Sequence, residues 1–364
     1  MPIARQSWLE KQWAGKQMQR RNFIRLTLGA LSILLSGGKQ ASAKSAADIK
    51  GTVKRIAFGS CCEQDNPQPI WKAIGETKPD VFLFIGDNIY ADTEDMALME
   101  SKYKLLGSKP EYAKFRSEVP VLATWDDHDY GINDGGNEYP KKEESKKLML
   151  DFFEEPKDSE RRSRSGIYTS YSLGPKGQNL QIVLLDLRWF RTPLIFDKEN
   201  GYVPNPDPKA TMTGEQQWAW LEEELKKPAD LRIIASGIQF ASSEHRWEKW
   251  ANYPADKKRM LDLIDKLKVK NAILISGDMH FAELSAEDTP GGIKLFDLTA
   301  SGMNIVEPGS QFPNKNRIEL YEKTPHFGFI EIDWEKPKVS VDLQIRSDAG
   351  ATVISKTVSY DRLS

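Results

Sequence analysis

The sequence is poor in cysteine, and it has no block of like charge and no long apolar run. Its 364 residues include two cysteines, which are adjacent at positions 61 and 62. They exclude a disulfide framework, and a bond between them is disfavoured, because adjacent Cα atoms lie ~3.8 Å apart and unstrained disulfides need about 4.4 Å or more. The net charge is −2 and the sequence has no basic tract, so no stable nucleic-acid complex is expected. With 39% hydrophobic residues, the chain can bury a large globular core.

The first 43 residues are predicted to be a targeting segment and not part of the fold. Arg20 and Arg21 precede a weakly apolar run, residues 26–36, which is too short to span a bilayer. Small residues at 41–43 then give a cleavage pattern. The segment is similar to a twin-arginine signal, so we expect the twin-arginine machinery to export the folded protein to the periplasm or the medium. An uncleaved amphipathic anchor is the alternative.

Strand and helix patterns alternate through the first two thirds of the chain, and the tail is rich in strands. Apolar runs predict strands at residues 55–59, 81–85, 121–125, 180–187, 232–240 and 272–276. Helical spacing predicts helices at residues 94–107, 110–119, 141–153, 213–225 and 256–267. We expect an α/β fold of two packed mixed β-sheets flanked by helices, in one domain. A plain doubly wound sheet is the alternative.

Four predicted strands end in residues that can bind metal ions. Residues 85–92, read IGDNIYAD, place Asp87 and Tyr90 directly after one strand, and Gly86 allows the backbone to turn there. The other three segments are FGSC at 58–61, TWDDHD at 124–129 and ISGDMH at 275–280. Metal ligands from four strand ends at one edge predict the site of a two-metal hydrolase.

Six segments, in this order, resemble the alkaline phosphatase D (PhoD-like) family of the calcineurin-like metallophosphatase superfamily. They are GSC at 59–61, GDNIY at 86–90, WDDHD at 125–129, LDLR at 185–188, GEQQWAWL at 214–221 and SGDMH at 276–280. Each is weak alone, but their order is specific. The resemblance implies an αββα sandwich over residues 44–364 and hydrolysis of phosphomonoesters and phosphodiesters at alkaline pH.

Donor chemistry divides the candidate metal ligands into two sets. One set has soft and borderline donors that suit iron: Cys61, Asp87, Tyr90 and His280. The other offers only oxygen, which suits Ca²⁺ before Mg²⁺ or Mn²⁺: Asp87, Asp127, Gln239 and Asp278. Asp126 could supply an oxygen to a second calcium, whereas Cys62 is expected to be a buried small residue. The resemblance implies the same pairing of Fe³⁺ with Ca²⁺.

His128 is the candidate general acid, or a donor to the phosphoryl group. A flanking carboxylate, Asp129 or Asp126, is expected to orient it. The alternative is a histidine at a strand end that is satisfied by its neighbours and has no role in catalysis.

Polar residues outside the metal ligands also have expected roles or positions. Asn88 is a candidate substrate contact. Arg188 is expected to form a structural ion pair with Asp186 that supports the floor of the site, and a substrate contact in which Arg188 grips phosphate is the alternative. His245 is expected at the surface, and the basic segment 161–164 is expected to be solvated.

Together these observations predict an exported, metal-dependent alkaline phosphatase or phosphodiesterase that uses metal-activated water. Its expected partners are small phosphate-ester substrates, with phospholipid or nucleotide diesters as further candidates. Two alternatives stay open. One is a phospholipase D-like or organophosphate-cleaving hydrolase on the same metals, and the other is a non-catalytic metal-binding protein of the envelope.

Overall fold

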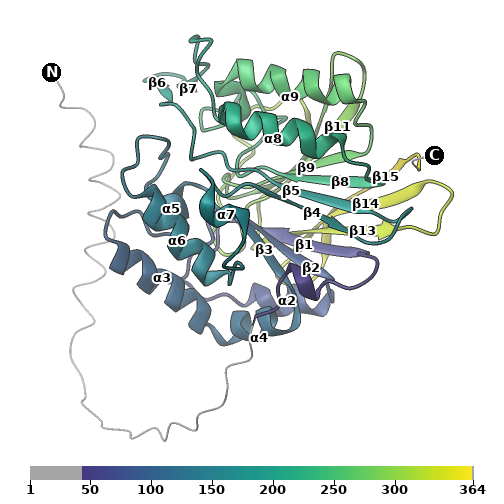
Figure 1. The fold of residues 1–364 in the computed structure, drawn as a ribbon, viewed down its shortest axis with the longest axis horizontal. Coiled ribbons are helices and arrows are strands. Elements are labelled where there is room, and N and C mark those ends of the chain that lie inside the picture. Colours follow the sequence, from purple (N-terminus) through teal and green to yellow (C-terminus); the bar gives the residue numbers. More distant parts are fainter. Residues whose placement is uncertain (1–42, 363–364) are drawn as a thin grey trace, which may run out of the picture. The chain divides into compact units, whose positions relative to one another are not determined.

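The computed structural model describes residues 43–362, so the predicted twin-arginine segment lies outside the described residues except for its last residue. Within this range two β-sheets pack against each other, and helices cover the outer face of each (Figure 1). This is the predicted αββα architecture, and the doubly wound alternative is wrong. None of the helices in residues 43–362 combines the length and the apolar character needed to cross a membrane.

The parallel strands of the first sheet all end at the same edge. Its strands, in spatial order, are β15 (Thr352–Tyr360), β14 (Val339–Ser347), β13 (His326–Asp333), β1 (Arg55–Gly59), β2 (Val81–Ile85) and β3 (Val121–Thr124). β1, β2 and β3 are parallel, with Gly59 beside Phe84 and Ile85 beside Thr124. β2 is buried on both faces, which explains its uninterrupted apolar sequence VFLFI.

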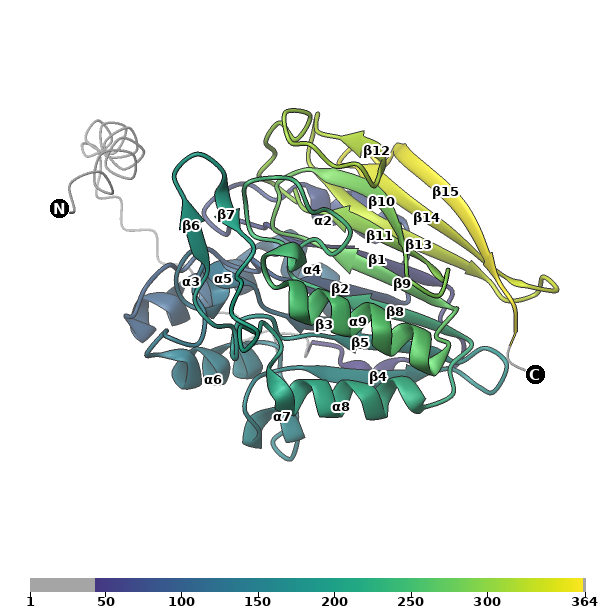
Figure 2. The same cartoon turned by 90° about the horizontal axis from the view of Figure 1, so that it is seen from above.

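The second sheet repeats this arrangement. Its strands, in spatial order, are β12 (Arg317–Tyr321), β10 (Ala282–Asp288), β11 (Lys294–Ala300), β9 (Ala272–Ser276), β8 (Leu231–Ala235), β5 (Leu180–Leu184) and β4 (Thr169–Leu173). β5, β8, β9 and β11 are parallel, and β4 and β5 form an antiparallel pair. β6 (Ile195–Asp197) and β7 (Gly201–Val203) form a separate small hairpin (Figure 2).

Helices occupy both outer layers. The helical elements of the described residues are η1 (Ala46–Asp48), α2 (Ile70–Glu76), α3 (Met96–Ser108), α4 (Pro110–Glu118), α5 (Asp127–Tyr130), α6 (Lys142–Phe152), α7 (Glu160–Ser163), α8 (Gly214–Lys226), η2 (Trp250–Asn252) and α9 (Pro254–Leu267). α8 and α9 cover the second sheet, and α2, α3, α4 and α6 lie on the side of the first (Figure 1). The apolar faces of both sheets form the central core, for example Leu83 and Ile233.

Two predicted strands are shorter than expected. The run at 232–240 leaves the sheet after Ala235, and the run at 180–187 leaves it after Leu184. Beyond β8, Gly237 packs closely against the carboxylate of Asp126: a Cβ on Gly237 would lie 2.8 Å from an Asp126 oxygen. The residues that follow both strands therefore become loops at the edge where the parallel strands end.

Two predictions about the surface are wrong. Arg161 is buried: its guanidinium pairs with Glu155 at 2.9 Å and donates to the carbonyl oxygens of Ala123 and Ile167. His245 is also buried, and its Nδ1 accepts the backbone N–H of Trp247. Charged sequence neighbours suggested that both residues are solvated, but the fold buries both side chains and hydrogen-bonds them there.

Candidate metal centre

The candidate metal centre lies where the parallel strands of both sheets end. The first sheet contributes the residues after β1, β2 and β3, and the second contributes those after β8 and β9. A parallel bridge between Ser60 and Ser301 joins the sheets at this edge. Four ligand candidates have left-handed backbone conformations: Cys61 (φ 59°), Asp87 (φ 49°), Asp278 (φ 70°) and His280 (φ 59°). Residues other than glycine are rarely found in this left-handed region, and the surrounding structure must stabilise them there. They are more frequent at functional sites than elsewhere.

Gly86 allows the end of β2 to approach the end of β3. It has φ +115°, and a Cβ on it would lie 2.5 Å from the Cβ of Asp126. We expect Gly86→Ala to displace Asp126, to destabilise the fold by about 1–3 kcal/mol and to reduce metal binding. Thermal unfolding and metal analysis measure the two effects. Gly177→Ala is the matched control, because Gly177 has φ +83° but open space around its Cβ. Equal effects of both substitutions would contradict the displacement of Asp126.

The structure brings together the four residues assigned to iron. Cys61 Sγ lies 3.3 Å from Asp87 Oδ2, and Tyr90 Oη lies 3.4 Å from the same oxygen. Tyr90 Oη is also 3.1 Å from His280 Nε2. Ser301 supports the group: its Oγ lies 3.0 Å from Cys61 Sγ and accepts the backbone N–H of His280 at 2.8 Å. A thiol, a carboxyl, a phenol and an imidazole at one point form a donor set typical of a transition metal.

A second group, made of carboxylates, adjoins the first. Oxygen atoms of Asp126, Asp127 and Asp278 lie within 4.8 Å of one another. Ligand atoms of Asp87, Asp127 and His128 form another group within the same distance. Asp87 therefore lies between the thiol-containing group and the carboxylate group, as a bridging ligand would. Hard oxygen donors of this kind suit Ca²⁺ or Mg²⁺.

Gln239 is buried in the loop after β8. Its Nε2 donates to Thr299 Oγ1 at 2.9 Å and lies 3.4 Å from Glu283 Oε1. Asp297 holds the loop, because its Oδ2 accepts the backbone N–H groups of the two residues after Gln239, each at 2.9 Å. The hydrogen bond to Thr299 fixes the amide nitrogen of Gln239, so the amide oxygen points away from Thr299. This orientation is compatible with an oxygen ligand, although no contact joins Gln239 to the carboxylate group in the described residues.

The electrostatics of these donors favours bound cations. Asp87 Oδ1, Asp126 Oδ2 and Asp127 Oδ1 are buried and receive no hydrogen bond from the described residues. Burial, followed by the charge of Cys61, raises the pKa of Asp87 well above its usual range. Burial also raises the pKa of Cys61 to about 11 and that of Asp126 to about 7. A cation among these groups relieves their repulsion and displaces their protons, so the residues present fit metal ions.

His128 lies beside these groups and is held by Asp92, a residue that the sequence did not identify. Its Nδ1 lies 2.8 and 2.9 Å from the two oxygens of Asp92, and its ring lies 4.3 Å from that of Tyr90. Burial disfavours the imidazolium, but the negative charges of Asp127 and Asp87 outweigh burial and raise the pKa of His128 well above its usual value. Because Nδ1 is engaged by Asp92, Nε2 is the nitrogen that can act on a ligand.

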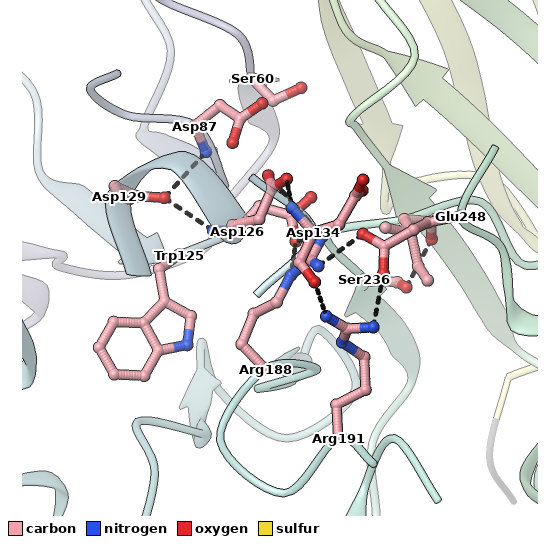
Figure 3. Close-up of polar contacts among 12 residues, drawn as sticks. Ser60, Asp87, Trp125, Asp126, Asp129, Asp134, Arg188, Arg191, Ser236 and Glu248 are labelled. Carbon is pink, nitrogen blue, oxygen red and sulfur yellow. Dashed lines mark hydrogen bonds and ion pairs between the residues drawn. The ribbon is translucent and has the colours of Figure 1, made fainter. Parts of the chain in front are cut away.

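Asp129 does not orient the imidazole as predicted. Its Oδ1 accepts the backbone N–H groups of Asp87 and Asp126 at 3.1 and 2.8 Å (Figure 3). Its Oδ2 accepts Asn88 Nδ2 at 2.5 Å, which leaves this amide nitrogen facing the protein and not a substrate. The reason is that α5 begins shortly after β3 with a capping box, in which Asp129 accepts the backbone N–H of Asp126 at the helix N-cap. Asp92 is therefore the carboxylate that holds the histidine.

Arg188 lies in a buried ion network beside the carboxylate group (Figure 3). Its Nε donates to Asp126 Oδ1 and its Nη1 to Glu248 Oε2, both at 2.5 Å. Arg191 pairs with the same glutamate at 3.0 Å. Asp186, the expected partner, instead accepts the backbone N–H of Arg188 at 3.0 Å. With 1% of its surface exposed, Arg188 neutralises and positions Asp126, and this arrangement favours the structural interpretation over a substrate contact.

Comparison with known sequences gives a family match over most of the chain. The sequence model of the family described as PhoD-like phosphatase matches residues 56–343. Alkaline phosphatase D of Bacillus subtilis (strain 168) is 23% identical over 334 residues, which cover 76% of this chain and 54% of that protein. The chain thus spans about half the length of this relative.

Solved structures show the same fold. A structure of PhoD has a TM-score of 0.67 at 16% identity, with 85% of this chain and 68% of that chain covered. GAP50, described as the anchor in the inner membrane complex of Plasmodium, has a TM-score of 0.56 at 13% identity, covering 86% and 90%. A dimetal phosphatase from Danio rerio has a TM-score of 0.52 at 12% identity, covering 85% and 100%. The family match confirms the resemblance seen in the six ordered segments: the chain belongs to the PhoD-like phosphatase family.

Proposed function

We propose that this chain is an exported, metal-dependent alkaline phosphatase and phosphodiesterase that uses Fe³⁺ and one or two Ca²⁺ ions. The proposal rests on two donor groups of different softness that adjoin at Asp87, with His128 beside them. Iron would be held by Cys61, Asp87, Tyr90 and His280. Calcium would be held by Asp87, Asp127, Gln239 and Asp278, with Asp126 as a further ligand.

The side chains around the metals have separate tasks. When bound, the metal ions lower the pKa of water and neutralise charge on phosphoryl oxygens. Asp92 accepts a hydrogen bond from Nδ1–H of His128, which leaves Nε2 as the nitrogen available to the metal groups. A protonated Nε2 can donate to the phosphoryl oxygens or to the leaving oxygen of the ester. Arg188 opposes the effect of burial on Asp126, because its positive charge lowers the pKa of this carboxyl.

The family and the named relative support phosphate esters as the substrate class. The preference among monoesters, diesters and phospholipids is tested with one panel at alkaline pH, to which a phosphotriester is added. We expect monoester and diester hydrolysis by the same active site. Turnover confined to the phospholipid or the triester would favour the alternative hydrolases, and no turnover by metal-loaded protein would favour a non-catalytic metal-binding protein.

Export is tested by locating the full chain in cell fractions, with Arg20→Lys/Arg21→Lys as the matched variant.

Removal of calcium is expected to lower hydrolysis by about tenfold or more while iron and its colour remain, because oxygen-bound Ca²⁺ exchanges more readily than thiolate-bound Fe³⁺. The measurement is activity and metal content before and after treatment with a calcium-selective chelator. Chelator saturated with Ca²⁺ is the control. Added Ca²⁺ should restore the rate, and restoration by Zn²⁺ or Mn²⁺ alone would contradict the assignment of the oxygen ligands.

A further inference from the structure

A cavity of about 660 Å³ lies at the opposite end of β8 and β9 from the metal centre. It is lined by the end of α8, the segment after α9, and the chain after β15: residues 225–228, 267–271 and 359–362, with Arg232. The view in Figure 2 shows α8, α9 and the end of β15 converging toward one side of the molecule. β9 has five residues, so the cavity is at least about 15 Å from the metal ligands that follow this strand.

The cavity carries positive charge that the described residues do not neutralise. Lys226 and Lys227 pair with glutamates of α8, and Asp361 pairs with Lys338 at 2.8 Å. Four other cations have no carboxylate within ion-pairing distance in residues 43–362: Arg232, Lys268, Lys270 and Arg362. The ends of α8 and α9 each offer a charge of about −0.5, so an excess of roughly three positive charges remains.

Arg232 shows most directly that a counter-ion is lacking. It is 6% exposed, and its guanidinium donates to neutral oxygens only, such as Gln181 Oε1 at 2.9 Å and Asn271 Oδ1 at 2.8 Å. A buried guanidinium is normally paired with a carboxylate, because its desolvation is costly. Since its N–H groups are occupied, Arg232 can attract an anion through its charge without donating to it.

Hydrogen-bond donors for an anion are also present. Lys268 and Lys270 are exposed at the cavity, and neither ammonium group hydrogen-bonds within residues 43–362. A group with several acceptor oxygens would satisfy these donors and the buried charge together.

We propose that this cavity binds a small anion that carries two or more phosphate groups. A single orthophosphate would leave much of the charge and of the volume unused, since pockets of about 300–1,000 Å³ hold larger ligands. The site is separate from the proposed hydrolytic centre and does not depend on that activity.

The test uses methylenediphosphonate, which has a P–C–P bridge that resists hydrolysis, in isothermal titration of the metal-loaded protein. The variant is Lys268→Asn/Lys270→Gln, with asparagine chosen because Lys268 has φ 52°, which asparagine tolerates. We expect affinity at this site to fall by about tenfold or more, while thermal unfolding and ester hydrolysis stay unchanged.

The matched control is Lys104→Gln/Lys147→Gln, which removes the same charge from two exposed lysines elsewhere. Binding to the catalytic metals is common to all variants and cancels in the comparison. An equal loss of affinity in the control, or none in the cavity variant, would overturn the proposal.

Discussion

Replacing Cys61 with alanine is expected to remove iron and to lower kcat/KM by about 10²–10³-fold, because a metal acting as a Lewis acid contributes several kcal/mol to the transition state. Cys61 Sγ lies 3.3 Å from Asp87 Oδ2, so the thiolate belongs to the same donor group as the bridging carboxylate. A thiolate and a phenolate bound to Fe³⁺ absorb visible light by charge transfer. The measurements are iron content, visible absorption and kcat/KM.

Cys62→Ala is the matched control for this substitution. Cys62 is equally buried but lies in the apolar cluster between the first sheet and its helices. We expect Cys62→Ala to keep its iron, its colour and its activity. Bleaching and inactivation of the Cys62 variant instead of the Cys61 variant would show that the wrong thiol has been assigned.

Replacing His128 with alanine is expected to lower kcat/KM by ~10²–10⁴-fold with both metals retained, since a positioned general acid contributes an effect of this size. The loss should be larger for an alkyl ester than for an aryl ester, because the poorer leaving group needs the proton more. Metal analysis and the ratio of the two rates are the measurements. Wild-type turnover of the alkyl ester by the variant would contradict this role.

Asp92→Asn separates positioning from proton donation. Removing this negative charge lowers the raised pKa of His128. A proton donor works only below its pKa, so the alkaline limb of the pH–rate profile should move to lower pH. Asp95→Asn is a control, because Asp95 is a nearby carboxylate that caps α3 and does not contact the imidazole. An unchanged pH–rate profile in the Asp92→Asn variant would show that Asp92 does not influence proton donation by His128.

The parallel strands could be predicted because burial on both faces makes their sequences continuously apolar. β2 and β9 were therefore placed at their observed limits. β10 and β12 were not found, since their sequences AELSAED and RIELY are short or largely polar. The pairing of β10 with β11 and of β12 with β10 depends on tertiary contacts that no local sequence pattern predicts.

The ligand candidates could be predicted from the sequence for a similar reason, because each follows a recognisable strand. The residues that orient them were harder to find. Asp92 was visible at the end of IGDNIYAD, but its contact with His128 depends on how α5 turns after β3. No sequence pattern marked Glu248 as part of the site, since its loop reaches Arg188 only when the second sheet is assembled.

The two sheets share their donor groups, and this couples metal binding to global stability. Cys61 and Asp87 come from the first sheet, whereas Asp278 and His280 come from the second. An ion bound across them has high affinity only for the state in which the sheets are docked, so it adds about 4 kcal/mol of stability at a free concentration roughly 1,000 times its Kd. Amide hydrogen exchange should therefore slow in both sheets together when metal is added, even in strands that are remote from the ligands.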